Sequence, residues 1–253
     1  MSLESAELAK VALNSYVTMK ITFANVLQEI CQRMPNGDVD AVTDAIGLDR
    51  RIGRRYLSGG LGFGGPCFPR DNRAFHFIAS QLGVQAELAK STDQLNGTLL
   101  NLMAGRVISM LKPGSTVAVL GLSYKPHSQV IEASQAVALA KALCAEGFRV
   151  VAYDPLAIAA AQTEFRNSIV LLPSARACLA EADGVVVATP DPEFHRLTAA
   201  DFGACSRGAA VFDLWRVLGQ GVRRCGRIRY VPMGVAPAFA EGDRVLKKLW
   251  SGR

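Results

Sequence analysis

Cys67 lies in a setting that favours a reactive thiol. It follows a glycine-rich stretch, residues 58–66, and precedes Pro69, which suits the first turn of a helix expected over residues 70–82. A thiolate, the nucleophilic form of cysteine, is favoured at a helix N-terminus and beside a cation such as Arg70. This context predicts covalent chemistry at Cys67. The competing interpretation is a buried, inert cysteine.

Three polar residues could assist such a nucleophile. Lys10 and Asn14 are four residues apart in a predicted helix, so they share one of its faces. Asp71 falls in the first turn of the helix after Cys67, where a carboxylate also complements the helix dipole. Spacing alone favours ordinary surface roles for Lys10 and Asn14.

Residues 1–112 are predicted to form a helical domain. Apolar residues recur at helical spacing from residue 6 to about residue 34, and again from about 86 to 111. Pro113 and Gly114 stop the second of these helices and mark the expected domain boundary. The first helix has apolar residues on more than one face, so part of it is expected to be buried against a second copy of the chain.

Residues 113–253 have the pattern of a Rossmann-like α/β domain. Short apolar segments, typical of buried strands, alternate with helical segments, and this alternation predicts a parallel sheet covered on both faces. The expected strands are residues 117–120, 149–153, 168–172, 184–188 and 209–213. Ligands of such sheets bind outside the carboxyl ends of the strands. The fold class is therefore α/β, with an all-helical domain first.

The composition disfavours several kinds of function. The formal net charge is +6, but the basic residues form no stripe interleaved with aromatic residues, so no nucleic-acid partner is expected. The six cysteines and three histidines show no metal-ligand spacing. No apolar run approaches the roughly 20 residues of a membrane helix, and the N-terminus has no signal pattern. We expect a cytoplasmic protein without metal or membrane partner.

The fingerprint of dinucleotide binding, G-x-G-x-x-G after a strand, is absent from the predicted sheet. Gly121 stands alone after the first strand, and the glycine-rich stretch before Cys67 follows a helix. The sequence therefore offers no recognisable NAD-binding residues of its own.

Residues 62–71, G-F-G-G-P-C-F-P-R-D, resemble the active-site signature of the UDP-glucose/GDP-mannose dehydrogenase family, which usually reads G-F-G-G-S-C-F-P-K-D. Further similar segments follow the family's order: residues 6–14, 47–53, 121–126, 153–155 and 213–216. The sequence is identified as a member of this family. The resemblance implies a central dimerisation domain and a domain that binds a UDP- or GDP-sugar. It also implies that the NAD-binding domain is missing, through truncation or loss.

Family members oxidise the C6 alcohol of a nucleotide sugar to a carboxylate with two NAD molecules. By resemblance, Cys67 attacks an aldehyde to give a thiohemiacetal, which is oxidised to a thioester and hydrolysed. Lys10 would stabilise oxyanion charge, Asn14 would orient substrate or water, and Asp71 would position the hydrolytic water. The implied substrate-binding residues are Tyr56, Leu57, Gly59, Gly62, Phe63, Gly64, Gly65, Arg51, Tyr124, Lys125 and Arg216.

One segment departs from the family pattern. Residues 127–135 read H-S-Q-V-I-E-A-S-Q where the family usually has N-T-D-D-x-R-E-S-P, so Glu132 stands where an arginine would help to hold the cofactor. Leu214 and Trp215 also separate Arg216 from the aspartate that the family follows with Gly-Arg. The departure supports an alternative function, a non-catalytic module that binds a nucleotide sugar and dimerises.

A third interpretation is the substrate half of a hydroxyacid-type dehydrogenase, which is disfavoured because such enzymes need no cysteine loop. The sequence leaves the sugar open, and UDP-glucose is the favoured substrate.

Overall fold

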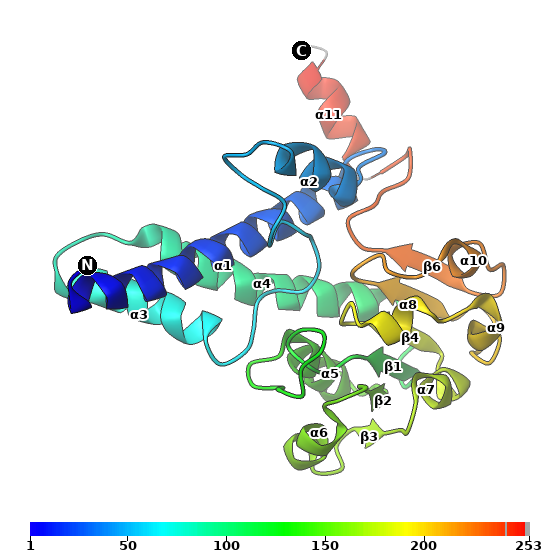
Figure 1. Ribbon diagram of the computed structural model, residues 1–253. Coiled ribbons are helices and arrows are strands. Elements are labelled where there is room, and N and C mark those ends of the chain that lie inside the picture. The colour runs from blue at the N-terminus through cyan, green and yellow to red at the C-terminus, as the bar shows by residue number, and fades with distance from the viewer. Residues whose placement is uncertain (241, 251–253) are drawn as a thin grey trace. The chain divides into compact units, whose positions relative to one another are not determined.

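The computed structural model describes residues 1–240 and 242–250, which form two compact units (Figure 1). The helical unit comprises Met1–Gly62, Arg70–Asn96 and the chain from Met233 onward. The Rossmann-like unit comprises Phe63–Pro69 and Gly97–Pro232. The chain thus passes between the units repeatedly, whereas the sequence predicted one boundary after residue 112. Two short segments, Phe63–Pro69 and residues 233–240, belong to the unit that is distant in sequence, and the main division falls between Asn96 and Gly97, earlier than predicted.

Long helices dominate the helical unit, as the sequence predicted. The helices that lie in it wholly or in part are α1 (Leu3–Arg33), α2 (Val39–Gly47), α3 (Phe68–Gln81), α4 (Glu87–Met110) and α11 (Asp243–Trp250). The first two residues of α3 and the part of α4 after Asn96 belong to the Rossmann-like unit. Capping side chains begin two of them: the Ser2 hydroxyl accepts from the Ser5 amide, and the Asp38 carboxylate accepts from the Asp40 and Ala41 amides. The helix predicted from residue 70 begins earlier, at Phe68, so that Cys67 immediately precedes it.

α1 buries polar residues and exposes apolar ones. Its buried positions are Asn14, Ser15, Thr18, Thr22, Ala24, Asn25, Gln28 and Cys31. Large apolar side chains on the same helix are exposed, among them Tyr16, Phe23 and Ile30, each about half accessible at 55%, 51% and 51%. These three recur every seven residues and so form one stripe along the helix. None of the helices in the part of the chain that the structure describes is both long and apolar enough to cross a membrane.

The chain from Met233 returns to the helical unit by main-chain hydrogen bonds. The Val39 amide donates to the Gly234 carbonyl (2.9 Å), the Ala236 amide to the Gly37 carbonyl (2.9 Å), and the Asn36 amide to the Pro237 carbonyl (3.1 Å). No sequence pattern predicted this segment, because its partners lie about 200 residues earlier and its own residues form no regular element. The segment closes the turn between α1 and α2.

A six-stranded parallel sheet forms the centre of the Rossmann-like unit, in the order β3-β2-β1-β4-β5-β6. The strands are β1 (Thr116–Leu120), β2 (Arg149–Tyr153), β3 (Val170–Leu171), β4 (Gly184–Val187), β5 (Ala210–Asp213) and β6 (Arg229–Pro232). The five predicted strands are confirmed, although β3 is shorter than expected. β6 was missed because its arginine and proline do not read as a buried strand, which agrees with its place at the sheet edge.

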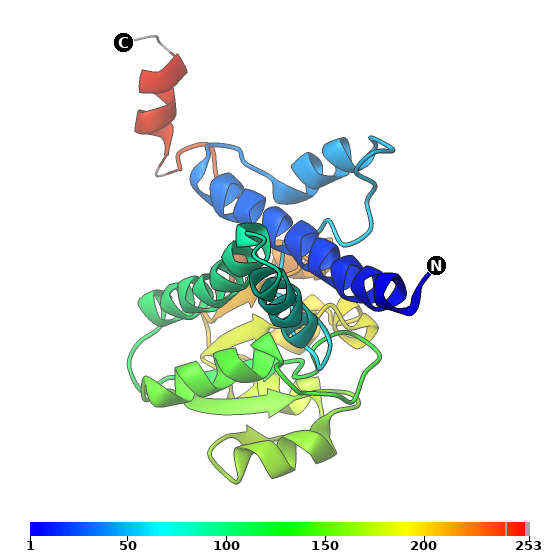
Figure 2. The same ribbon diagram turned by 90° about the vertical axis from the view of Figure 1, so that its left-hand side faces the viewer.

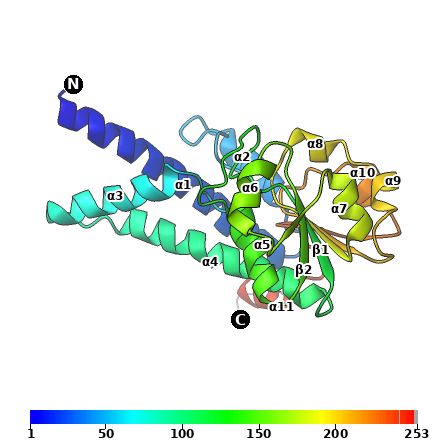
Figure 3. The same cartoon turned by 90° about the horizontal axis from the view of Figure 1, so that it is seen from below.

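Helices cover both faces of this sheet. The connecting helices are α5 (Gln135–Ala145), α6 (Ile158–Phe165), α7 (Ala175–Glu181), α8 (Pro192–His195), α9 (Ala199–Phe202) and α10 (Gln220–Arg223). α5 and α6 lie on one face, seen from the front in Figure 2, and α7 lies on the other, as Figure 3 shows edge-on. The prediction of a doubly covered parallel sheet is therefore confirmed.

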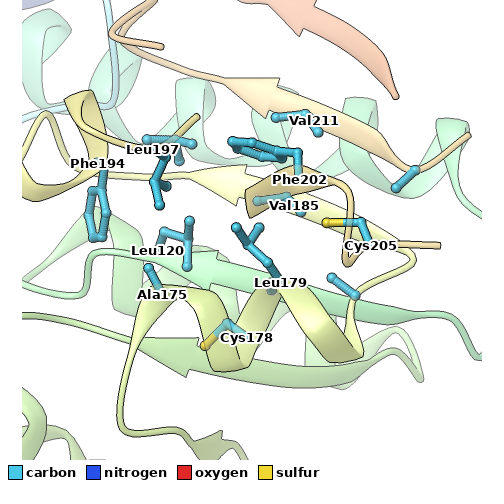
Figure 4. Close-up of a cluster of buried hydrophobic side chains, with 14 of the residues drawn as sticks. Leu120, Ala175, Cys178, Leu179, Val185, Phe194, Leu197, Phe202, Cys205 and Val211 are labelled. Carbon is cyan, nitrogen blue, oxygen red and sulfur yellow. The ribbon is translucent and has the colours of Figure 1, made fainter. Parts of the chain in front are cut away.

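The face under α7, α8 and α9 holds an apolar core (Figure 4). Leu120 and Val185 of the sheet meet Leu179, Phe194 and Phe202 of the helices, and all five are fully buried. Apolar packing of this kind supplies about 1.5–3 kcal/mol per large side chain. The rigid sheet that results fixes the loops at the carboxyl ends of its strands.

Candidate active site

Three of the four predicted catalytic residues meet in the helical unit. Lys10 Nζ donates a hydrogen bond to Asp71 Oδ2 (2.8 Å), and Asn14 Nδ2 donates to the same oxygen (2.6 Å). Arg70 Nε donates to the other oxygen, Oδ1 (3.0 Å). Lys10 and Asn14 come from one face of α1 and Asp71 from the first turn of α3. The spacing of four residues therefore does place the first two on one carboxylate.

The environment of Asp71 favours its ionised form. Burial of this side chain, which is 7% exposed, would by itself raise the pKa of the carboxyl group. The hydrogen bonds from Lys10, Arg70 and Asn14 outweigh burial, and the pKa of Asp71 lies below its ordinary value. Asp71 is therefore a carboxylate at neutral pH, suited to hold a cation or orient a water molecule.

A second polar contact fixes α3 against α1 one residue further along. Ser15 Oγ donates to Asn72 Oδ1 (2.9 Å), and Asn72 Nδ2 donates to the Ala89 carbonyl at the start of α4 (2.8 Å). Sequence reasoning missed Ser15 and Asn72. The available signal was their position directly beside Asn14 and Asp71, since a pair of adjacent polar residues on each helix suggests a shared polar contact.

The first part of the glycine-rich loop rests on amide side chains of α1. Asn25 Oδ1 accepts from the Gly60 amide (3.0 Å), and Gln28 Nε2 donates to the Gly60 carbonyl (3.2 Å). Added Cβ atoms on Gly59 and Gly62 would lie 2.9 Å from Gln28 Oε1 and 2.1 Å from an oxygen of Asn96. These glycines therefore serve close approach within the protein. Sequence reasoning missed Asn25, Gln28 and Asn96, whose residue types alone do not distinguish an inward helix face.

The second part of the loop, with the predicted nucleophile, belongs to the Rossmann-like unit. Cys67 is exposed, and Phe63 is buried in the same segment. The Gly65 amide donates to the Glu132 carbonyl (3.0 Å), which ties the segment to the loop after β1. An exposed thiol before the first turn of α3 satisfies the access that a nucleophile needs.

Tyr124 and Lys125 follow β1 at the carboxyl edge of the sheet. Lys125 is exposed, and its Nζ lies 5.4 Å from the centre of the Tyr124 ring. The turn before them is held by Asp154, whose Oδ2 accepts from the Leu122 and Ser123 amides at 2.7 and 2.8 Å. The carboxyl edge thus presents one cation and one aromatic ring where the fold places ligands.

Other predicted binding residues do not join these groups. Arg51 pairs with Asp49 (2.6 Å), and its side chain is 88% exposed. Tyr56 is exposed and has a positive φ of 61°, whereas Leu57 is buried. Arg216 is buried, also with positive φ, and its guanidinium donates to the Leu214 carbonyl (3.0 Å).

The Rossmann-like unit does not fit the pyrophosphate of NAD. Dinucleotide sites of this fold use a short glycine-rich turn that runs from the first strand straight into a helix N-terminus. Here residues 121–134 separate β1 from α5 and include a single glycine, Gly121. At the start of α5 the Ser134 hydroxyl already accepts from the Val137 amide (3.4 Å). We derive no step through NAD bound in this unit.

Both halves of the chain match one family of known proteins. Residues 4–98 match the UDP-glucose/GDP-mannose dehydrogenase family, central domain, and residues 118–220 match the UDP binding domain of the same family. The chain belongs to this family.

Relatives and solved structures agree with this assignment. The chain is 34% identical over 198 residues to the UDP-glucose 6-dehydrogenase TuaD of Bacillus subtilis, covering 78% of this chain and 43% of that protein. It is 30% identical over 242 residues to YwqF of the same species, also named a UDP-glucose 6-dehydrogenase, covering 92% and 55%. A UDP-glucose dehydrogenase structure from Pyrobaculum islandicum aligns with a TM-score of 0.81 at 32% identity, covering 91% and 51%. The chain spans about half the length of the relatives it matches.

Membership of the UDP-glucose/GDP-mannose dehydrogenase family confirms the fold class predicted from the sequence. The matched central domain contains the Lys10–Asn14–Asp71 contacts, and the matched UDP binding domain contains Tyr124 and Lys125.

Proposed function

We propose that the chain is the central and UDP-binding part of an NAD-dependent UDP-sugar 6-dehydrogenase, with UDP-glucose as the favoured sugar. The observation that carries this proposal is the contact of Lys10 and Asn14 with the ionised Asp71. An amine, an amide and a carboxylate, together with the exposed thiol of Cys67, are the groups that an aldehyde oxidation through a thioester requires.

Cys67 forms the covalent bond in this proposal. The thiolate attacks the C6 aldehyde and gives a thiohemiacetal, and loss of a hydride from that carbon leaves a thioester. NAD, where bound, would supply the hydride acceptor for both oxidations. Because the Rossmann-like unit does not fit this cofactor, we assign its binding to a part of the protein outside this sequence, consistent with relatives about twice as long.

The ionised Asp71 and its partners act on oxygen. Lys10, whose side chain is 58% exposed, keeps donors available for the oxyanion that develops when the thiolate attacks. Asn14 orients the substrate or the hydrolytic water, and Asp71 accepts a proton from that water as it attacks the thioester. Because Lys10 and Arg70 lower the pKa of Asp71, the carboxylate alone is a weak base, so positioning of the water is its main contribution.

The nucleotide end of the substrate binds the Rossmann-like unit. Lys125 supplies a cation for the diphosphate at the carboxyl edge of the sheet, and Tyr124 supplies an apolar face. The assigned binding residues of the glycine-rich loop, Phe63, Gly64 and Gly65, belong to the same unit.

The binding part of the proposal is tested by calorimetric titration of the chain with UDP, UDP-glucose, GDP-mannose and NAD. We expect saturable binding of UDP and UDP-glucose, no binding of NAD, and weaker binding in Lys125→Ala. The control is Lys141→Ala, which removes an exposed lysine of α5 that pairs with Glu164 of α6. Absence of nucleotide binding, or binding of NAD alone, would contradict the pocket assignment.

The covalent part is tested by alkylation of Cys67. Mass spectrometry of the peptide that contains Cys67 gives its rate of reaction with iodoacetamide, separately from Cys144 and Cys225, which are partly buried. UDP-glucose is expected to slow alkylation of Cys67 and leave the other two unchanged. Equal protection of all three thiols, or none at Cys67, would favour the non-catalytic alternative, in which the chain binds a nucleotide sugar without covalent chemistry.

We also propose a homodimer formed through α1. Its exposed stripe of Tyr16, Phe23 and Ile30 repeats every seven residues, the spacing at which helices pack against each other. Light scattering at high micromolar concentration should give twice the chain mass, and Phe23→Arg should give the monomer mass. Phe239→Arg, at a phenylalanine that is 88% exposed outside the stripe, should remain dimeric. A monomeric unmodified chain would refute the dimer.

A further inference from the structure

The two glycines before Cys67 fit against the loop that follows β1 with no room to spare. A Cβ atom on Gly64 would lie 2.2 Å from the Ala133 carbonyl oxygen. A Cβ atom on Gly65 would lie 2.6 Å from the Tyr124 ring, and Gly65 also has a positive φ of 82°. Real Cβ contacts are not this short, so the chain at Cys67 can take this position only because neither residue has a side chain.

The surface that receives these glycines is a folded loop, which we call the seat: Tyr124 with residues 130–134. The Tyr124 amide donates to the Val130 carbonyl (3.1 Å), and the Ser134 amide donates to the Ile131 carbonyl (3.0 Å). Ser134 Oγ donates to the Leu122 carbonyl (2.7 Å). Ala133 has a positive φ of 49°, a left-handed conformation that is unfavourable for a residue with a Cβ atom. The surrounding hydrogen bonds hold the seat in a shape that its residues would not adopt alone.

Asp154 connects the seat to the rigid sheet. Its side chain is 1% exposed. One oxygen accepts from the Leu122 and Ser123 amides, and the other accepts from the Leu156 and Ala157 amides at 2.9 and 2.8 Å. The carboxylate therefore joins the turn after β1 to the turn after β2. The position of the sheet can therefore determine the position of the seat through this turn. The hydrogen bond from the Gly65 amide to the Glu132 carbonyl then connects the seat to Gly65.

We propose that the seat positions Cys67 and that Tyr124 is a positioning residue for this thiol, acting through Gly65. The proposal rests on the proposed function in that Cys67 is the nucleophile. It gives Tyr124 a role in the free protein, before any nucleotide sugar binds. A rigid placement of the thiol matters because an error of about 1 Å in the position of a reacting group costs about 100-fold in rate.

The seat also explains how an unusual segment can keep a role in the site. Glu132 and Ala133 meet the glycines with their main-chain carbonyl oxygens, while the Glu132 side chain is exposed. Any residue type at position 132 offers the same carbonyl. The side-chain departures of residues 127–135 from the family pattern therefore need not disturb the placement of Cys67.

The test compares Gly65→Ala with Gly114→Ala in the whole chain without nucleotide. Gly114 has nearly the same backbone conformation, with a φ of 77°, but nothing lies within 4 Å of its added Cβ. The two variants thus share the backbone strain and differ in the collision with Tyr124. Hydrogen exchange of the peptide spanning residues 61–68, together with the alkylation rate of Cys67, reports on the placement of the thiol.

We expect Gly65→Ala to raise exchange in this peptide at least about 5-fold, the factor for a local destabilisation of about 1 kcal/mol, and to change the Cys67 alkylation rate. Gly114→Ala and Glu132→Ala should leave both unchanged. Tyr124→Phe should behave as the unmodified chain, because the ring remains, whereas Tyr124→Ala should raise exchange.

The double variant Gly65→Ala/Tyr124→Ala decides the matter, since removing the ring makes room for the added methyl. Exchange closer to the unmodified chain than in Gly65→Ala supports the seat. Defects that simply add, or a Gly65→Ala chain that behaves like Gly114→Ala, overturn it. These measurements omit the nucleotide sugar, so a failure of the proposed function would appear only in the titration and protection experiments.

Discussion

The interiors of the two units are built from different materials. In the Rossmann-like unit the strands β1 and β4 bury an unbroken apolar set, and the helices above them add leucine and phenylalanine. In the helical unit α1 buries asparagine, glutamine, serine and threonine, and hydrogen bonds from these side chains join α1 to α3 and to the glycine-rich loop. The Rossmann-like interior is almost wholly apolar, whereas the helical unit adds directed polar bonds to buried apolar side chains such as Val39 and Leu57.

The difference teaches where this chain can place chemistry. Apolar packing tolerates repacking, because volume matters more than direction. A buried polar contact does not, since an unpaired group costs about 1–3 kcal/mol. Such contacts fix their partners closely, and both the Asp71 cluster and the first part of the glycine-rich loop depend on them. In the Rossmann-like unit, buried polar groups such as Asp154 and Asp213 come at the carboxyl ends of strands, where loops must be fixed.

The largest effect should come from breaking the apolar interior. Phe202 is fully buried in the core shown in Figure 4. Phe202→Ala is expected to lower the free energy of unfolding by about 3–5 kcal/mol, because it removes apolar contacts and leaves a cavity. Urea denaturation measures the change. Phe239→Ala removes the same side chain at an exposed site and should change stability by less than about 0.5 kcal/mol; equal losses would contradict the assigned core.

The next effect concerns the polar interior at Asp71. Asp71→Ala leaves Asn14 without its acceptor and should cost about 1.5–3 kcal/mol, the range for hydrogen bonds to charged groups. The pKa of Asp71 is lower in the folded chain, so its contribution is present above the unfolded value of about 3.9 and is lost as pH falls through the folded value.

Urea denaturation as a function of pH checks this assignment. The stability of the unmodified chain and the Asp71→Ala variant should converge below about pH 4. Glu87→Gln, which removes an exposed pair with Lys90, serves as the control and should leave stability unchanged. A difference that persists at low pH would show that Asp71 acts through packing instead of charge.

A smaller effect is expected where the loop rests on α1. Gln28→Met keeps the length of the side chain but removes the donor to the Gly60 carbonyl, at a cost of about 1–2 kcal/mol. Hydrogen exchange should rise at residues 59–62, while the sheet of the Rossmann-like unit keeps its protection. Gln81→Met, at an exposed position of α3, should have no effect. Unchanged exchange in the loop would mean that Asn25 alone supports it.

The smallest effect is expected at Tyr153, a partly buried residue that packs against the apolar core of the Rossmann-like unit. Tyr153 donates to Glu193 (3.2 Å), and burial followed by the nearby carboxylates raises the pKa of Tyr153 to about 12. Tyr153→Phe should cost about 0.5–1.5 kcal/mol at neutral pH. Because the raised pKa means that the protonated phenol is stabilised by folding, this difference should shrink as pH rises above about 10. Absorbance titration should show the loss of one tyrosine that ionises near pH 12; an unchanged titration would contradict the assignment.

The sequence predicted the elements well where one chain segment decides the outcome. The long helices and five of the strands follow from periodicity. The spacing of Lys10 and Asn14 placed them on one helix face, but their contact with Asp71 was not predicted. β6 was missed because an edge strand tolerates arginine and proline.

Contacts between distant segments were beyond reach. Asn25, Gln28 and Asn96 support the glycine-rich loop through side chains whose types suit a surface equally well, so pattern alone could not direct them inward. Two domains were predicted, but the assignment of short segments to them was hidden, since it depends on which main-chain groups meet partners far away in the chain. Periodicity predicts helices and strands, but it does not predict the contacts of irregular segments.

The closing segment from Met233 has a consequence for the order in which the protein can be made. Its main-chain hydrogen bonds to Asn36, Gly37 and Val39 join residues about 200 positions apart. A ribosome must therefore complete the Rossmann-like unit before these bonds can close the turn after α1. The turn between α1 and α2 is therefore closed by a segment that is made long after both helices. A cut at Pro113 would separate α1 and α2 from the segment whose main-chain hydrogen bonds close the turn between them.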